Sequence, residues 1–120
     1  ENSEWATPVV VVMKPNNKIR LCGDYRLTLN PVLEKVVYPL PRIEYIFEQL
    51  RGGKQFSKID LSDAYQQVRL SPESQKLVTI STHKELFKVT RLPFGICNAP
   101  ALFQKLMDNL IAGIPGVVCF

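Results

Sequence analysis

The sequence has few of the residues from which metal centres and disulfide frameworks are built. It contains three cysteines, Cys22, Cys97 and Cys119, with no C-x-x-C pair, and a single histidine, His83. This set argues against a structural zinc site, which combines four Cys and His ligands at short spacings. An odd number of widely separated cysteines is typical of a reducing compartment, where they behave as small hydrophobic side chains.

Long apolar runs are lacking as well. No run approaches the roughly 20 apolar residues that a membrane-spanning helix needs. The first residues, ENSEW, have neither the basic nor the apolar segment of a secretory signal. We therefore expect an intracellular protein without a membrane partner.

The composition is otherwise that of a globular protein. The 120 residues are 46% hydrophobic and 22% charged, enough for one modest domain or for part of a larger one. The formal net charge is +4. A charge of this size permits a polyanionic partner without requiring one.

Residues 56–61, FSKIDL, read as a short strand that follows a glycine turn. Alternation along a strand puts Ile59 and Leu61 on one face and Asp60 on the other. If the apolar face is buried, Asp60 is presented on a rigid element, as suits a ligand for Mg²⁺. In the alternative, Asp60 and Asp63 are ordinary solvated residues, and spacing alone favours this interpretation.

Residues 8–14 and 18–22 flank a Pro-Asn-Asn turn and predict a β-hairpin with Ile19 and Leu21 packed inward. Lys18 and Arg20 then share the other face, with Lys14 near the tip. Three cations on one arm could clamp a phosphate. They could equally guard an edge strand against aggregation, and the sequence leaves both interpretations open.

The remaining pattern predicts both helices and strands. In order, we expect a loop over 27–38, a helix over 42–50, a turn over 70–73, a hairpin of strands 76–82 and 85–92 with His83 in its turn, a helix from Asn98 to Ile111 whose apolar stripe is core, and a buried strand over 116–120. Gly95 permits a close backbone approach or a positive φ. The predicted class is α+β.

Four stretches carry a family resemblance: LCGDYR (21–26), YPLPRIE (38–44), FSKIDLSDAYQQV (56–68) and RLPFGICNAPALFQKLM (91–107). In order and spacing they resemble successive blocks of the reverse transcriptases encoded by gypsy-type LTR retrotransposons. The resemblance implies a partial right-hand polymerase fold, with β-hairpins of the fingers and part of the palm. It implies that 1–120 is fingers and N-terminal palm, without thumb, connection or RNase H.

The resemblance also implies an activity, an RNA-directed DNA polymerase that transfers nucleotides by a two-metal mechanism with Mg²⁺ or Mn²⁺. The implied partners are an RNA or DNA template with its primer, deoxynucleoside triphosphates and the remainder of a Pol polyprotein. The implied location is the cytoplasm or virus-like particles.

Site residues follow from the same resemblance. Asp60 matches a catalytic, metal-binding aspartate, and the Leu61 carbonyl matches a backbone metal ligand. The implied nucleotide-binding residues are Lys14, Lys18, Arg20, Asp63, Ala64, Tyr65 and Phe94. Within that set Asp63 and Ala64 act through backbone N–H groups, and Tyr65 is a steric gate against ribonucleotides. The implied template and primer contacts are Asp24, Arg26, Gly95, Asn98 and Pro100.

One departure limits what this chain can do. The family's other two catalytic aspartates belong to a Tyr-x-Asp-Asp motif expected directly after Phe120. Asp60 alone cannot neutralise two dications, so we expect the chain by itself to be inactive. A non-catalytic nucleic-acid-binding module and a decayed retroelement fragment remain alternative interpretations.

Overall fold

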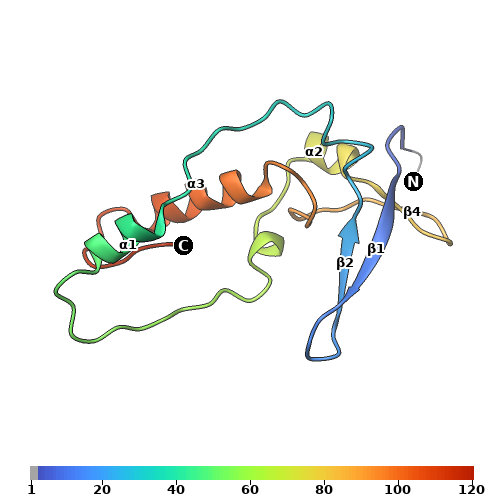
Figure 1. The fold of residues 1–120 in the computed structure, drawn as a ribbon. Coiled ribbons are helices and arrows are strands. Elements are labelled where there is room, and N and C mark those ends of the chain that lie inside the picture. Colours follow the sequence, from blue (N-terminus) through green and yellow to red (C-terminus); the bar gives the residue numbers. More distant parts are fainter. Residues whose placement is uncertain (1–2) are drawn as a thin grey trace. The chain divides into compact units, whose positions relative to one another are not determined.

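The computed structural model describes residues 3–120, and the chain divides into two compact units, each made of two separate stretches. Unit 1 comprises Glu1–Lys35 and Asp63–Ala99, and unit 2 comprises Val36–Ser62 and Pro100–Phe120. Strands belong to unit 1, while helices occur in both (Figure 1). The predicted α+β class is confirmed. No helix within residues 3–120 is long and apolar enough to span a membrane.

Unit 1 is organised by a four-stranded sheet in the order β2-β1-β3-β4. Its strands are β1 (Thr7–Met13), β2 (Ile19–Gly23), β3 (Ile80–Ser81) and β4 (Leu86–Phe87). The β1–β2 and β3–β4 pairs are antiparallel, so both predicted hairpins are confirmed. The inner pair, β1 with β3, is parallel and joins the two stretches of unit 1.

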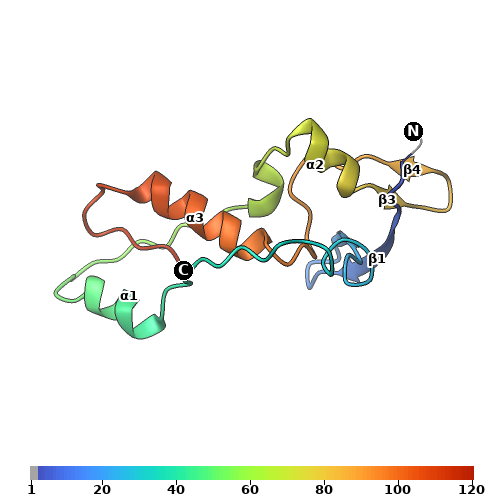
Figure 2. The ribbon, with the colours of Figure 1, turned by 90° about the horizontal axis from the view of Figure 1, so that it is seen from above.

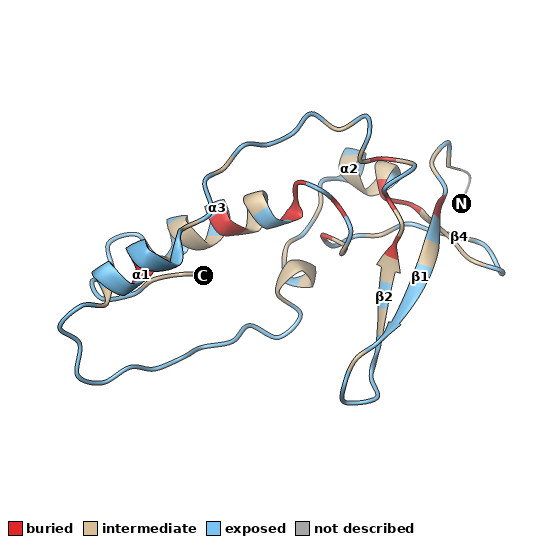
Figure 3. Cartoon of the chain, in the orientation of Figure 1, coloured by how far each residue is buried: buried red, intermediate tan, exposed pale blue. Residues whose placement is uncertain are grey.

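The first hairpin buries the face opposite to the predicted one. Ile19 is 61% exposed and Leu21 is 58% exposed, whereas Arg20 and Cys22 are partly buried. Val11 pairs with Leu21 and Met13 with Ile19, so these four side chains form one exposed apolar face. The predicted orientation is wrong because the Arg20 side chain packs against the ring of Phe94 in the same unit. In Figure 3 much of the hairpin is pale blue, with tan and red stretches where its residues are partly or fully buried.

The core of unit 1 forms around Tyr25, which is fully buried and donates from Oη to the carbonyl oxygen of Val78 at 3.0 Å. The other buried apolar members are Leu29, Val78, Leu92, Ile96 and Ala99. The segment predicted as a loop over 27–38 indeed has turns and extended backbone only. Its Leu29 nevertheless belongs to the core.

The turn predicted over 70–73 is the start of a helix, α2 (Pro72–Leu77). Ser71 caps it, since its Oγ accepts the backbone N–H of Ser74, and Pro72 lies in the first turn, where its missing N–H costs nothing. The predicted strand 76–82 is therefore shortened to β3. The predicted strand 85–92 is shortened to β4, followed by an isolated bridge between Arg91 and Arg69. His83 is exposed in the turn, as predicted.

Unit 2 contains α1 (Ile43–Gln49) and nearly all of α3 (Ala99–Ile111), which confirms both predicted helices (Figure 2). The apolar stripe of α3 is less buried than predicted, because Leu106 is 39% exposed and Leu110 is 63% exposed. The polar side chain of Gln104 is buried, and its Nε2 donates to Asp108. Asp108 also accepts a 2.6 Å hydrogen bond from Tyr38 Oη.

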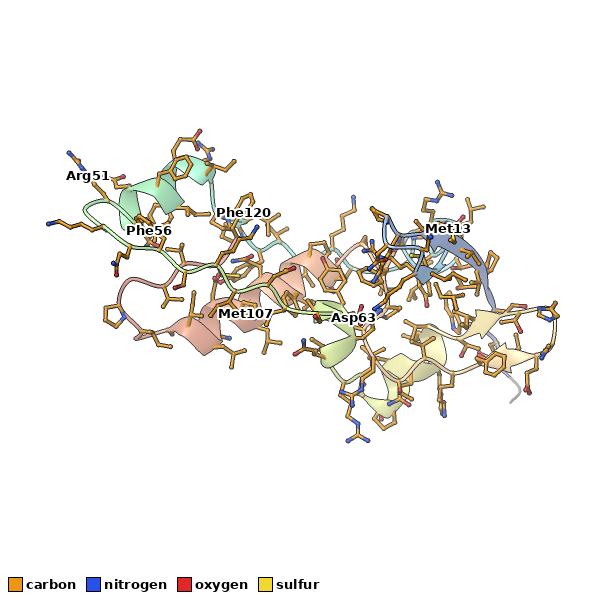
Figure 4. All side chains as sticks on the ribbon, turned by 90° about the horizontal axis from the view of Figure 1, so that it is seen from below. Met13, Arg51, Phe56, Asp63, Met107 and Phe120 are labelled. Carbon is orange, nitrogen blue, oxygen red and sulfur yellow. The ribbon has the colours of Figure 1, made fainter. Side chains whose placement is uncertain are left out.

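Two predicted strands, 56–61 and 116–120, are irregular backbone. Ile59 is 86% exposed and Phe120 is 83% exposed, and Leu61 does not pack inward either. A strand is stable only when a neighbour completes its hydrogen-bond ladder, and within residues 3–120 neither segment has such a neighbour. Figure 4 labels Phe56 and Phe120 on these segments.

Candidate nucleotide-binding site

Three side chains predicted to contact a nucleotide lie together in unit 1, and we refer to Arg20, Tyr65 and Phe94 as the aromatic–arginine cluster. The guanidinium carbon of Arg20 is 4.6 Å from the centroid of the Phe94 ring, within the range of a cation–π contact. The Tyr65 and Phe94 centroids are 5.3 Å apart at an interplanar angle of 47°. Strand β2, the 3₁₀ helix η1 (Ala64–Gln67) and the turn before α3 each supply one member.

The Arg20 side chain retains hydrogen-bonding capacity. Its Nε is buried and has no hydrogen-bond partner among residues 3–120. A buried donor without a partner costs free energy comparable to a lost hydrogen bond. An acceptor from a ligand would remove that cost, so the cluster is suited to an anion that approaches Arg20.

A further pair of predicted residues meets at the edge of the same unit. Lys14 Nζ lies 3.5 Å from Asp63 Oδ1, and the two side chains are 28% and 65% exposed. Ion pairs this exposed contribute little stability, so Lys14 can exchange Asp63 for a ligand anion at small cost. Asp63, labelled in Figure 4, has φ of 48° and caps η1, with the half-buried Ala64 next in the chain.

Lys18 lies apart from these contacts. It is exposed at the hairpin tip, where its backbone carbonyl accepts the N–H of Lys14 at 2.8 Å. Its backbone N–H is held by the Asn16 side chain. Of the two lysines between which the sequence leaves the choice open, Lys14 is the one that contacts another predicted site residue, Asp63.

Three of the predicted template and primer residues, Asp24, Arg26 and Asn98, are held by hydrogen bonds within unit 1. Asp24 accepts two bonds from the Arg26 guanidinium, at 2.7 and 2.8 Å, and this interaction lowers the pKa of Asp24 and raises that of Arg26. Asn98 Nδ2 donates to the Glu34 carbonyl oxygen at 2.9 Å. Pro100 is exposed in the first turn of α3 and is assigned to unit 2.

Asn30, which the sequence did not single out, fixes the turn that carries Phe94. Its Nδ2 donates to the Gly95 carbonyl oxygen and its Oδ1 accepts the Cys97 N–H, both at 2.9 Å. Gly95 has φ of +99°, and a Cβ there would lie 2.5 Å from the Gly23 carbonyl oxygen. The predicted close approach at Gly95 is confirmed. An asparagine in a turn-rich segment gives no signal of a contact so distant in sequence.

Asp60 and Leu61 belong to unit 2, where both are exposed on irregular backbone. Within residues 3–120, no three His, Cys, Asp or Glu side chains gather closely enough to hold a metal ion. Two divalent cations need several carboxylates. The described residues by themselves therefore do not make a two-metal centre.

Comparison with known proteins identifies the family. The sequence pattern described as reverse transcriptase (RNA-dependent DNA polymerase) matches residues 12–120. The chain belongs to the reverse transcriptase family.

Relatives are much longer than this chain. An uncharacterized protein of Caenorhabditis elegans is 46% identical over 120 residues, covering 98% of this chain and 9% of the relative. The retrovirus-related Pol polyprotein from transposon 412 of Drosophila melanogaster is 38% identical over 118 residues, covering 93% of this chain and 10% of that polyprotein. The chain thus spans about a tenth of the length of these relatives.

Solved reverse transcriptases share the fold. The native prototype foamy virus protease-reverse transcriptase aligns with a TM-score of 0.84 at 29% identity, covering 100% of this chain and 16% of the other. A foamy viral protease-reverse transcriptase in complex with dsDNA aligns with a TM-score of 0.82 at 26% identity, covering 100% of this chain and 25% of that one. The four-stranded sheet and helices therefore form part of a reverse transcriptase polymerase fold.

Proposed function

We propose that the chain supplies the fingers and N-terminal palm of a gypsy-type retrotransposon reverse transcriptase, and that unit 1 binds the incoming deoxynucleoside triphosphate. The observation that carries this proposal is the Arg20 guanidinium stacked on Phe94, with Tyr65 against the same ring. Arg20 has a free buried donor for a phosphate oxygen, and Lys14 supplies a second, exchangeable cation.

The aromatic members have a different role from the cations in this proposal. Phe94 holds the guanidinium plane in place, which reduces the entropy lost when Arg20 binds phosphate. Tyr65 offers a flat ring on which a sugar can rest, and a 2′-hydroxyl would clash with it. Deoxynucleotides are then preferred by steric exclusion, and Asp63 and Ala64 contact the triphosphate through their backbone.

The catalytic part of the proposal depends on residues outside this chain. In the complete polymerase domain, bound Mg²⁺ or Mn²⁺ would supply the Lewis-acid chemistry of nucleotidyl transfer. Asp60 and the Leu61 carbonyl would be two of the ligands, and the remaining carboxylates would come from the rest of the polymerase domain. The partners are then an RNA or DNA template with its primer and the rest of a Pol polyprotein, in the cytoplasm or in virus-like particles.

A second candidate is a module that binds nucleotide or nucleic acid without chemistry. The absence of a carboxylate cluster around Asp60 within residues 3–120 favours it for the chain taken alone. In that case triphosphate binding persists and primer extension is absent. The two candidates therefore differ in activity and not in affinity.

Triphosphate binding by the 120-residue chain tests the proposal. Arg20→Ala should weaken the binding of a fluorescent deoxynucleoside triphosphate roughly tenfold or more, as expected for the loss of a charge-assisted hydrogen bond. Arg51→Ala is the matched control, because Arg51 is exposed in the turn after α1. Equal effects of the two variants would return the hairpin cations to an edge-guarding role.

Catalysis is tested in a longer protein in which the rest of the polymerase domain continues this chain. Asp60→Asn keeps the size of the side chain and removes its charge. Primer extension should fall by several orders of magnitude while template binding is retained. Unchanged extension would remove Asp60 from the catalytic site.

A further inference from the structure

Two arginines of unit 1 lie directly opposite each other on neighbouring backbone segments. Arg69 and Arg91 form an isolated antiparallel bridge. It is flanked by hydrogen bonds from Leu70 N–H to the Thr90 carbonyl at 3.0 Å and from Leu92 N–H to the Val68 carbonyl at 2.9 Å. In this arrangement the two arginines are a non-hydrogen-bonded pair, the closer kind, with side chains on one face. Both are exposed.

No carboxylate among residues 3–120 lies within ion-pair distance of either arginine. Like charges directly opposite in a sheet are destabilising. Among residues 3–120, the side-chain ion pairs within 4 Å are Lys14 with Asp63 and Arg26 with Asp24, so neither opposed arginine has a carboxylate partner. Arg91 donates from Nη1 to the Gln67 carbonyl oxygen at 3.3 Å, which fixes one edge of its guanidinium.

A small cavity adjoins Arg91. Arg91 and Gln66 both line an opening of about 160 Å³. The Oε1 atom of Gln66 is buried without a hydrogen-bond partner among the described residues. Gln66, with its unpaired acceptor, and Arg91, with its partly fixed guanidinium, thus line the same cavity, and a ligand that carries both an anionic oxygen and a hydroxyl or amine donor would satisfy both groups.

We propose that Arg69 and Arg91 form a phosphate-binding site for a polynucleotide strand, separate from the aromatic–arginine cluster. Two guanidinium forks on one face match the oxygens of a phosphodiester, and a sugar hydroxyl or base amine of the same strand supplies the donor for Gln66. The phosphate chemistry follows from the arginine pair itself. Its assignment to a polynucleotide rests on the proposed function.

The test measures binding of a short fluorescent single-stranded DNA to the full 120-residue chain at several salt concentrations. The variant is Arg69→Gln with Arg91→Gln. The matched control is Arg51→Gln with Lys54→Gln, which removes the same charge from an exposed turn of unit 2. Loss of one phosphate contact should lower the logarithmic salt slope by about 0.7 and weaken affinity several-fold. The control should change neither to that extent.

Two further variants test the guanidinium geometry and the Gln66 acceptor separately. Arg69→Lys with Arg91→Lys keeps both charges and removes the forks, so its affinity should fall while the salt slope is retained. Gln66→Leu removes the acceptor, so it should weaken binding of the DNA and leave binding of inorganic phosphate unchanged. Thermal melts of every variant verify that the sheet is intact.

The outcomes separate this site from the nucleotide site. The inference is supported if the arginine variant loses DNA affinity and keeps triphosphate affinity, even when Arg20→Ala has no effect and the nucleotide proposal fails. Equal losses in the arginine variant and its charge control overturn it. Binding of inorganic phosphate at the pair, without any loss of DNA affinity in the variant, overturns the polynucleotide assignment.

Discussion

Asn30 donates from Nδ2 to the carbonyl oxygen of Gly95 at 2.9 Å, and through this bond the segment after β2 holds the turn that presents Phe94. The bond from Cys97 N–H to Asn30 Oδ1 closes the other side of the turn. One amide thereby fixes the backbone on both sides of Ile96, a core residue.

Replacing Asn30 by Ala should lower the free energy of unfolding by about 1 to 3 kcal/mol, since two backbone groups lose their partners. It should also weaken triphosphate binding, because the Phe94 turn is no longer fixed. Urea denaturation and nucleotide titration measure the two effects. Asn109→Ala, at an exposed position of α3, is the control. An Asn30 variant as stable as the parent chain would contradict the assignment.

Burial of the Tyr25 hydroxyl should make the fold less stable in alkali. Burial raises the pKa of Tyr25 to about 12, from 10.0 in the unfolded chain. Between these two pH values the Tyr25 hydroxyl keeps its proton in the folded state and has released it in the unfolded state. The contribution of the protonated Tyr25 to the free energy of unfolding is therefore complete below pH 10 and is lost as the pH rises toward 12. The full effect is on the order of 2 to 3 kcal/mol.

The measurement is chemical denaturation at several pH values, compared with Tyr25→Phe. The variant should be less stable at neutral pH, because it loses the hydrogen bond to Val78. Its stability should decline less steeply above pH 10. Parallel pH profiles for the two proteins would show that other groups cause the alkaline loss.

Tyr65 gives a prediction about substrate choice. In a longer protein that contains the complete polymerase domain, Tyr65→Ala should leave DNA synthesis measurable and increase incorporation of ribonucleotides, because the excluding ring is gone. Primer extension with matched deoxy- and ribonucleoside triphosphates measures the ratio. Tyr45→Ala is a suitable control, since Tyr45 is an exposed tyrosine of α1. An unchanged ratio in the Tyr65 variant would rule out a gating role.

The exposed apolar face of the first hairpin predicts self-association. Val11, Met13, Ile19 and Leu21 are each 58% to 61% exposed on one side of two paired strands. Contiguous exposed apolar surface on a hairpin promotes association. Ile19→Lys should lower the concentration dependence of sedimentation or light scattering without lowering the melting temperature. Lys18→Gln, next to it in sequence, should not. Identical scattering by the Ile19 variant and the parent chain would contradict this.

Local sequence signals predicted the elements that depend on local interactions. Turn residues, caps and apolar spacing predict the two hairpins and the helices α1 and α3. The helix α2 was missed, although Ser71 and Pro72 are both typical of a helix start. The apolar residues that follow also fit the pattern of a strand, but the Ser71 cap and Pro72 start a helix here.

The errors at the first hairpin and at residues 56–61 share another physical cause, which is that burial depends on partners far away in the sequence. Alternation at Ile19 and Ile59 is a valid strand signal, but it does not show whether anything covers that face. Arg20 points inward because its guanidinium packs on the ring of Phe94, which is distant in sequence. The aromatic–arginine cluster was predicted through family resemblance, whereas Asn30 depends on a contact with residues 95–97 that no local pattern announces.

The parallel pairing of β1 with β3 has a consequence for synthesis on the ribosome. Thr7 pairs with Ile80, and the first stretch of unit 2 is translated between them. The first hairpin is therefore translated early, and β3, which pairs with β1, is translated only later. Pairings this distant form slowly, and the open strand edge stays accessible to other chains in the meantime. Unit 1 can complete its folding only when most of the chain has been translated.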